Sequence, residues 1–256
     1  MKTMRTIAIM NQKGGVAKTV TCVNMAAILA ADYEKRVLVV DADSQANTTE
    51  FFGGLPGGAI SLGDLLRKSK MDGLIHPANF PGVSLIGADD SLMDLDLSAV
   101  KSRTADVSAL ARLLALRADD FDYCLIDCPP AFNAASAAAL LAAEDVIIPI
   151  KPDAFSLRGM GNLLRQIRNM QEINPGLHMA GLLPTMVYRS ERVKNAMDIL
   201  NKSGFPLFPA VRRSARVDDM TFAQTPLIKS SPNSAACVDY RRFVKAYLRG
   251  GEWYAV

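Results

Sequence analysis

The fold of this chain is decided by the stretch Asn11-Gln12-Lys13-Gly14-Gly15-Val16-Ala17-Lys18-Thr19. An apolar run over residues 6–10 comes before it and predicts a buried strand, and small residues over 20–31 come after it and predict a helix. The phosphates of a nucleotide are bound by an arrangement of four parts in this order: a strand, a glycine-containing loop, Lys-Thr and a helix. The glycines allow backbone N–H groups to turn toward the anion, and the helix N-terminus adds partial positive charge.

Individual side chains of this loop suit particular roles. Lys18 is placed to reach the β- and γ-phosphates, and the hydroxyl of Thr19 is placed to bind Mg²⁺. The loop departs from the general pattern G-x-x-x-x-G-K-[ST], because Gln12 and Ala17 occupy its two glycine positions. We expect the methyl group of Ala17 to be tolerated if its φ angle is negative. The loop also has an additional lysine, Lys13, five residues before Lys18.

Two further predicted strands end in aspartate. The strand over 37–41 ends in Asp41 and is followed by Asp43, and the strand over 123–127 ends in Asp127. Because open α/β sheets bind ligands at the carboxyl ends of their strands, we expect these carboxylates beside the phosphate loop. The hydrophobic strand that ends in Asp127 resembles a Walker B segment, and this resemblance implies that Asp127 would hold a Mg²⁺-bound water. Taken alone, Asp43 is better explained as a cap on the turn that follows it, but beside the phosphate loop a role at the nucleotide is favoured.

These motifs resemble those of a known family. The pattern Lys-Gly-Gly-x-x-Lys-Thr over 13–19 resembles the deviant Walker A box of ParA/MinD-type P-loop ATPases, and the wider stretch 11–19 is most similar to the ParA/Soj branch. The pair Pro129-Pro130, shortly after Asp127, resembles the family's phosphate-sensing loop. The chain departs from the family at Ala17, where glycine is usual, and at Ser44, where proline is usual.

The resemblance implies an ATPase that uses ATP and Mg²⁺ and that dimerises face to face with ATP between the subunits. Lys13 would contact the phosphates bound by the partner subunit, Lys18 would neutralise charge on the γ-phosphate, and Asp43 would position or activate the attacking water. Asp41 would lie near the metal. The implied metal ligands are Thr19, Asp43 and Asp127. The implied nucleotide contacts are Lys13, Gly14, Gly15, Val16, Ala17, Lys18, Thr19, Val20, Met186 and Pro209.

Predicted strands and helices alternate along the rest of the chain. We expect an α/β fold in one domain over 1–256, with a mostly parallel twisted sheet and helices on both faces. The resemblance identifies this as the three-layer P-loop NTPase fold. Further strands are predicted at 83–86, 145–150, 179–185 and 205–209, and helices at 62–66, 91–117, 156–173, 190–203 and 234–249.

Composition excludes some classes of protein. Half of the residues are hydrophobic and 21% are charged, which is an ordinary balance for a globular protein. The longest apolar stretch, 134–143, is too short to span a membrane and ends at an acidic pair. Scattered cysteines in predicted core elements favour free thiols in a reducing cytoplasm. They are Cys22, Cys124, Cys128 and Cys237.

Charge is distributed unevenly. Residues 1–150 hold 13 Lys and Arg against 18 Asp and Glu, a net charge of −5, whereas residues 151–256 hold 16 against 8, a net charge of +8. A basic C-terminal part favours a polyanionic partner, although a solvated basic face explains it equally well. The resemblance implies that this partner is DNA. The expected DNA contacts are Arg212, Arg213, Arg216, Arg241, Arg242 and Lys245.

The first functional hypothesis is a ParA-type partition ATPase. Its ATP-bound homodimer would bind DNA nonspecifically, and a ParB-like partner would stimulate hydrolysis. We expect a cytoplasmic protein that is nucleoid-associated when ATP-bound and that has no stable membrane association. The chain starts at the strand before the phosphate loop, without the N-terminal DNA-binding extension of some relatives, so DNA affinity should fall steeply with salt.

Two other hypotheses remain open. A MinD-like membrane-associated ATPase, which regulates cell division or cargo positioning, would need an amphipathic helix within 240–256 that inserts into the bilayer. A relative of the nitrogenase iron protein, or a cluster carrier, would need exposed cysteines shared between subunits, and Cys124 and Cys128 are the only close pair.

Overall fold

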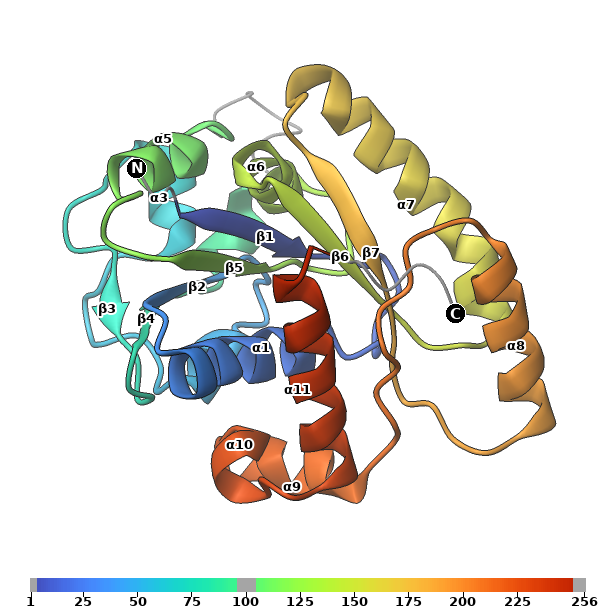
Figure 1. Ribbon diagram of the computed structural model, residues 1–256. Coiled ribbons are helices and arrows are strands. Elements are labelled where there is room, and N and C mark those ends of the chain that lie inside the picture. The colour runs from blue at the N-terminus through green and yellow to red at the C-terminus, as the bar shows by residue number, and fades with distance from the viewer. Residues whose placement is uncertain (1–3, 96–104, 251–256) are drawn as a thin grey trace.

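The computed structural model describes residues 4–95 and 105–250, and at 155–159 the backbone alone (Figure 1). Seven strands form one sheet in the order β3-β4-β2-β5-β1-β6-β7. Neighbouring strands are parallel except β3 and β4, so the predicted mostly parallel sheet is confirmed. The strands are β1 (Arg5–Ile9), β2 (Val37–Asp41), β3 (His76–Pro77), β4 (Val83–Ile86), β5 (Tyr123–Asp127), β6 (Asp145–Ile150) and β7 (His178–Pro184).

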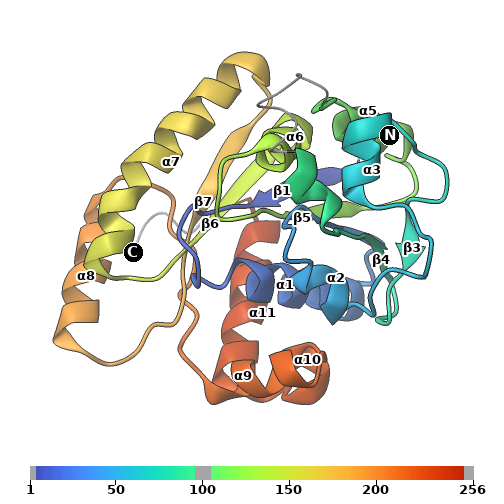
Figure 2. The same ribbon diagram turned by 180° about the vertical axis from the view of Figure 1, so that it is seen from behind.

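Helices cover both faces of the sheet, as the sequence predicted (Figure 1 and Figure 2). One layer holds α1 (Lys18–Tyr33), α2 (Asn47–Phe51), α9 (Ala215–Phe222), α10 (Leu227–Ser230) and α11 (Ala235–Leu248). The opposite layer holds α3 (Leu62–Lys68), α5 (Ala109–Leu116), α6 (Ala134–Ala142) and α7 (Ala154–Ile173), with α8 (Glu191–Lys202) beyond the β7 edge.

Alternate residues of each strand face the two layers. In β1, Ala8 packs in the core beneath α5 and α6, whereas Ile7 and Ile9 pack in the core beneath α1 and α11. Side chains alternate across a strand, so a strand covered on both faces must be apolar at nearly every position. This requirement explains the continuous apolar runs in the sequence.

Two predicted elements are wrong in part. The helix expected over 91–117 is interrupted at 105–108, because Asp106 bonds elsewhere: its N–H donates to the carbonyl of Leu66 (2.8 Å) and its carboxylate accepts from the Ser108 N–H (3.2 Å). Its middle, 96–104, lies outside the described residues. The strand expected over 205–209 is a single bridge from Leu207 to Leu182, since prolines on both sides lack the N–H that a ladder needs.

The strand order brings the predicted acidic residues together. Strand β5 lies between β2 and β1, and Asp127 at its end is in register with Asp41 of β2 and Ile9 of β1. The phosphate loop follows Ile9 directly. Residues far apart in sequence thus meet at one edge of the sheet, as expected for an open α/β fold.

Candidate nucleotide-binding site

The phosphate loop is fixed by the ends of two neighbouring strands. The side-chain amide of Asn11 donates to the carbonyl of Pro149 at the end of β6 (2.7 Å) and accepts from the N–H of Lys13 (3.0 Å). Beyond β7, the hydroxyl of Thr185 donates to the carbonyl of Val16 (3.1 Å). These bonds hold the loop in place at both its start and its end, which prepares its backbone N–H groups for an anion.

The two unusual loop positions have different explanations. The side-chain amide of Gln12 donates to Gln166 of α7, so this residue tethers the loop where the general pattern has glycine. Ala17 has φ 67° and ψ 36°, in the left-handed region, and so does Gly15 with φ 67°. The condition under which the Ala17 methyl group was expected to be tolerated, a negative φ, is therefore not met. The chain must reverse before α1 begins at Lys18, and this turn requires the conformation that glycine adopts most easily.

The left-handed backbone at Ala17 leads to a stability prediction. Replacing Ala17 by glycine should raise the free energy of unfolding by about 0.5–1 kcal/mol, because a left-handed residue with a Cβ costs about 1–2 kcal/mol and glycine's extra entropy removes part of the gain. Chemical denaturation measures this change. Ala137, inside α6, is the matched control, and its replacement by glycine should lower stability by about 1 kcal/mol. Destabilisation by both substitutions would contradict the assigned backbone.

Lys18 and Thr19 begin α1 beside the strand-end carboxylates. The Lys18 side chain is buried, and its ammonium donates to the carbonyl of Lys13 (3.4 Å). Burial lowers the pKa of Lys18, while Asp127 and Asp43 oppose that change. The hydroxyl of Thr19 donates to Oδ2 of Asp127 (2.6 Å). The structure thus brings together the lysine, hydroxyl and carboxylate that the sequence assigned to phosphate and metal.

The two strand-end aspartates are buried side by side. Burial raises the pKa of both Asp41 and Asp127, and the charge of Asp127 raises the pKa of Asp41 further. Two threonines of α2, which the sequence did not predict, offset part of this cost. The hydroxyl of Thr48 donates to Oδ2 of Asp127 (2.6 Å), and Thr49 donates its N–H (2.8 Å) and hydroxyl (2.7 Å) to Oδ2 of Asp41.

Asp43 lies on the loop between β2 and α2 and is half-buried. Its Oδ1 accepts from the N–H of Gln45 (3.1 Å), which is the turn-capping bond expected of an aspartate there. Its charge nevertheless raises the pKa of Asp127 and opposes the lowering of the Lys18 pKa, so it belongs to the same electrostatic cluster. Both interpretations of Asp43 made from the sequence therefore fit its position.

The residues present fit a magnesium ion. Oδ1 of Asp127 is buried without a hydrogen-bond partner among the described residues, and the surrounding ligand atoms are hydroxyl and carboxylate oxygens. In the part of the chain that is described, no group of three or more His, Cys, Asp or Glu side chains is arranged to hold a metal by itself. Mg²⁺ typically takes one or two protein ligands and completes its shell with phosphates and water, which matches this arrangement.

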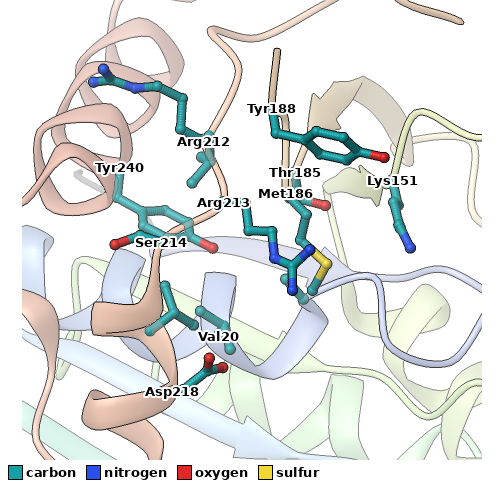
Figure 3. A pocket seen from close by; sticks show the side chains of 13 residues that line it. Val20, Lys151, Thr185, Met186, Tyr188, Arg212, Arg213, Ser214, Asp218 and Tyr240 are labelled. Carbon is teal, nitrogen blue, oxygen red and sulfur yellow. The ribbon is translucent and has the colours of Figure 1, made fainter. Parts of the chain in front are cut away.

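A pocket of about 300 Å³ lies next to the phosphate loop, with Ala17 and Val20 in its lining (Figure 3). Val20 and Met186 provide apolar surface, and the side chain of Arg213 extends toward Met186. A few polar groups around an apolar floor are typical of small-molecule sites. Pro209 does not line this pocket; the segment Val211, Arg212, Arg213 and Ser214 does. Met186 lines the pocket and its contact with a nucleotide stays a prediction, whereas Pro209 lies outside the lining.

Most of the arginines expected to contact DNA form ion pairs within the chain. Arg212 binds the buried carboxylate of Asp239 through two nitrogens (2.7 and 2.8 Å). Arg216 pairs with Asp219 (3.0 Å), Arg241 with Asp32 (2.7 Å) and Arg242 with Asp239 (3.7 Å). Among the described residues, no ion pair is formed by Arg213, which lines the pocket, or by Lys245.

Helix α11 argues against the membrane hypothesis. Its apolar residues Tyr240, Phe243 and Val244 are at most 1% exposed, and the hydroxyl of Tyr247 donates to Asp145 (2.6 Å). The apolar face predicted for bilayer insertion therefore packs on α1 and the sheet instead. None of the helices in the described ranges is both long and apolar enough to cross a bilayer. The end of that predicted segment, 251–256, lies outside the described residues.

The cluster-carrier hypothesis also lacks support. Cys124 and Cys128 are fully buried free thiols on either side of Asp127, in β5 and just after it. Burial raises the pKa of both, which disfavours the thiolate that an iron–sulfur cluster needs.

Comparison with known proteins shows the family of the chain. A family model described as an AAA domain matches residues 4–179. The chain is 34% identical to the chromosome partitioning protein ParA of Caulobacter vibrioides, over 96% of this chain and 94% of that protein. It is 30% identical to the chromosome-partitioning ATPase Soj of Thermus thermophilus, over 96% of each chain.

Solved structures show the same fold. An ATP complex of a McdA variant from Cyanothece superposes with a TM-score of 0.83 at 22% identity, over 98% of this chain and 97% of that one. A structure from Mycobacterium smegmatis, titled as cobyrinic acid a,c-diamide synthase with an ATP analogue and magnesium, gives a TM-score of 0.82 at 30% identity, with coverage of 98% and 97%. With the phosphate loop, the paired strand-end aspartates and full-length similarity to ParA and Soj, this chain belongs to the ParA/Soj family of partitioning ATPases.

Proposed function

We propose that this protein is a partition ATPase whose ATP-bound dimer holds DNA nonspecifically and releases it when a ParB-like partner stimulates hydrolysis. The observation that carries the proposal is the cluster of Lys13, Lys18, Thr19 and Asp127 at one edge of the sheet. The similarity to ParA and Soj over nearly the whole chain supports it. The packing of α11 into the core supports DNA rather than a membrane as the surface to which the dimer binds.

ATP hydrolysis at this site uses positioning and charge neutralisation. Thr19 and Asp127 would hold Mg²⁺, which would supply positive charge to neutralise the phosphates. Lys18 is held at the loop by the Lys13 carbonyl and stabilises negative charge on the γ-phosphate. Asp43, on the loop after β2, orients the attacking water. The same fold carries an ATP analogue and magnesium in the M. smegmatis structure.

Lys13 provides the link between two subunits. Its ammonium forms an ion pair with Asp153, at 2.8 Å from each carboxylate oxygen, and the two side chains are 34% and 28% exposed. Partly exposed ion pairs contribute about 1 kcal/mol or less, so Lys13 can exchange this carboxylate for a phosphate of the partner subunit. Asp153 therefore holds Lys13 at the rim of the site until the dimer forms.

A different group of basic residues is better placed to contact DNA than most of the arginines predicted from the sequence. Arg189, Arg192 and Lys194 are exposed at the start of α8 and line two hollows that share Tyr188 and Val193. No ion pair of theirs is found in the part of the chain that is described. Exposed cations at a helix end suit the phosphate backbone, which offers charge but no sequence information. We call these three residues the basic patch.

Removing the basic patch should weaken DNA binding and its salt dependence. The double variant Arg189→Ala/Arg192→Ala should bind DNA at least about tenfold more weakly in ATP, and the slope of log K against log salt should fall by about 2, because two phosphate contacts are lost. Filter retention across a salt series measures both quantities. Arg216→Ala, which removes an exposed arginine paired with Asp219, is the control and should stay within about twofold of the wild type. If only Arg216→Ala weakened binding, the basic patch would be the wrong surface.

A further inference from the structure

Thr48 contacts the proposed magnesium site from an element outside the recognised motifs. It lies on α2, a helix of five residues, and is fully buried. Its hydroxyl donates to Oδ2 of Asp127 at 2.6 Å. The hydroxyl of Thr19, from the phosphate loop, donates to that same oxygen, also at 2.6 Å. One carboxylate oxygen thus accepts hydroxyls from two separate segments of the chain.

These two hydrogen bonds to one oxygen fix the orientation of the carboxylate. With Oδ2 occupied by both hydroxyls, Oδ1 of Asp127 is left buried without a hydrogen-bond partner among the described residues. Buried carboxylate oxygens are normally satisfied, so this oxygen points to a ligand. A cation, or a water on a cation, supplies what Oδ1 lacks. The hydroxyl of Thr48 therefore helps to fix the direction in which the unsatisfied oxygen of Asp127 points.

Thr48 also ties the loop of Asp43 to Asp127. The loop leaves β2 at Asp41, and its far end is α2, where Thr49 returns to Asp41 through two hydrogen bonds. The hydroxyl of Thr49 accepts from the N–H of Ala88 (2.8 Å), which fastens the same helix to the region after β4. Thr49 thus anchors the loop to β2, the strand from which the loop begins, whereas Thr48 connects the loop to β5 through Asp127.

We propose that Thr48 is a positioning residue that orients Asp127 for Mg²⁺ and couples the occupied metal site to the loop carrying Asp43. This inference rests on the assignment of Thr19 and Asp127 to the metal. Removing a residue that forms a hydrogen bond to a metal ligand commonly lowers metal affinity by about 10–100-fold. A single hydrogen bond of about 1 kcal/mol corresponds to about fivefold.

The test is the Mg²⁺ concentration that half-saturates binding of a fluorescent ATP analogue, measured for full-length variants. Thr48→Val removes the hydroxyl at nearly constant volume and should raise this midpoint by about five- to tenfold. Thr48→Ser keeps the hydroxyl and should return the midpoint to within about twofold of the wild type. Hydrogen exchange at residues 42–47, with and without Mg²⁺, gives a second readout that does not depend on turnover. In Thr48→Val, the Mg²⁺-dependent protection of this loop should be lost.

Two controls separate positioning from general destabilisation. Thr21→Val removes another fully buried hydroxyl, one that contacts Tyr240 on the α11 side (3.3 Å), and should leave the Mg²⁺ midpoint unchanged even if thermal stability falls. Asp127→Asn should abolish the Mg²⁺ dependence and so tests the metal assignment by itself. The role of Thr48 would be overturned if the Mg²⁺ midpoint of Thr48→Val stayed within about twofold of the wild type while Asp127→Asn lost its Mg²⁺ dependence. The ATPase assignment would remain intact in that case.

Discussion

Replacing Lys13 by glutamine is expected to abolish the ATP-dependent dimer and to lower ATP hydrolysis by about 10²-fold or more, because one stabilising charge is withdrawn from the partner subunit's phosphates. ATP binding within one chain should persist, since Lys18 and the backbone of the phosphate loop are unchanged. Size-exclusion chromatography with light scattering, together with phosphate release, measures these effects. Lys70→Gln, which changes an exposed lysine just after α3, is the control.

The ion pair between Lys13 and Asp153 predicts that a substitution at Asp153 has the opposite effect on dimerisation. Asp153→Asn removes the charge that pairs with Lys13 at 2.8 Å. The fraction of dimer at a given ATP concentration should then increase by up to about fivefold, because a surface ion pair contributes about 1 kcal/mol. A Lys13→Gln variant that dimerises normally would refute the role of Lys13 in the dimer. If Asp153→Asn dimerised less than the wild type, Asp153 would instead be part of the dimer contact.

Replacing Asp43 by alanine should trap the ATP-bound dimer. Hydrolysis is expected to fall by about 10²–10⁴-fold, the range for loss of a group that positions or activates water, whereas ATP binding and dimerisation should remain. DNA retention in ATP should then become insensitive to the stimulating partner. Asp43→Asn keeps the shape and the turn-capping oxygen that accepts from Gln45, so it separates the loss of charge from the loss of the turn.

Two outcomes would contradict this role for Asp43. If Asp43→Ala were monomeric in ATP, the residue would be needed to build the loop rather than to hydrolyse ATP. If Asp43→Ala hydrolysed ATP at the native rate, Asp43 would serve only as the cap of its turn, which is the interpretation that the sequence left open.

Much of the site was predictable because its signals are local. The phosphate loop is recognised from nine consecutive residues, and each aspartate from the end of one apolar strand. Parallel strands align their carboxyl ends, so the meeting of Asp41 and Asp127 followed from fold class alone. The interruption of the predicted 91–117 helix was not predictable, because it depends on the hydrogen bond from the N–H of Asp106 to the carbonyl of Leu66 in α3, which the helical pattern does not contain.

The basic C-terminal part shows the limit of composition. Its net charge of +8 predicted a surface for a polyanion, but the number of arginines does not reveal which of them are paired within the chain. Arg241 pairs with an aspartate 209 positions earlier, and Arg212 with one 27 positions later. Such pairs form only when packing brings two elements together, so the exposed cations at the start of α8 became evident only in the fold.

The sequence by itself determined the phosphate loop, the order of the two acidic strand ends and the family, because these depend on residue types at short spacing. Tertiary structure alone decided the left-handed backbone of Ala17, the ion pair that holds Lys13, and the convergence of Thr19 and Thr48 on one oxygen of Asp127. The physical reason is the distance along the chain over which the deciding interactions act. Local patterns fix what a segment can bind, whereas the direction of a buried oxygen or the pairing of a charged side chain depends on atoms supplied by segments distant in the chain.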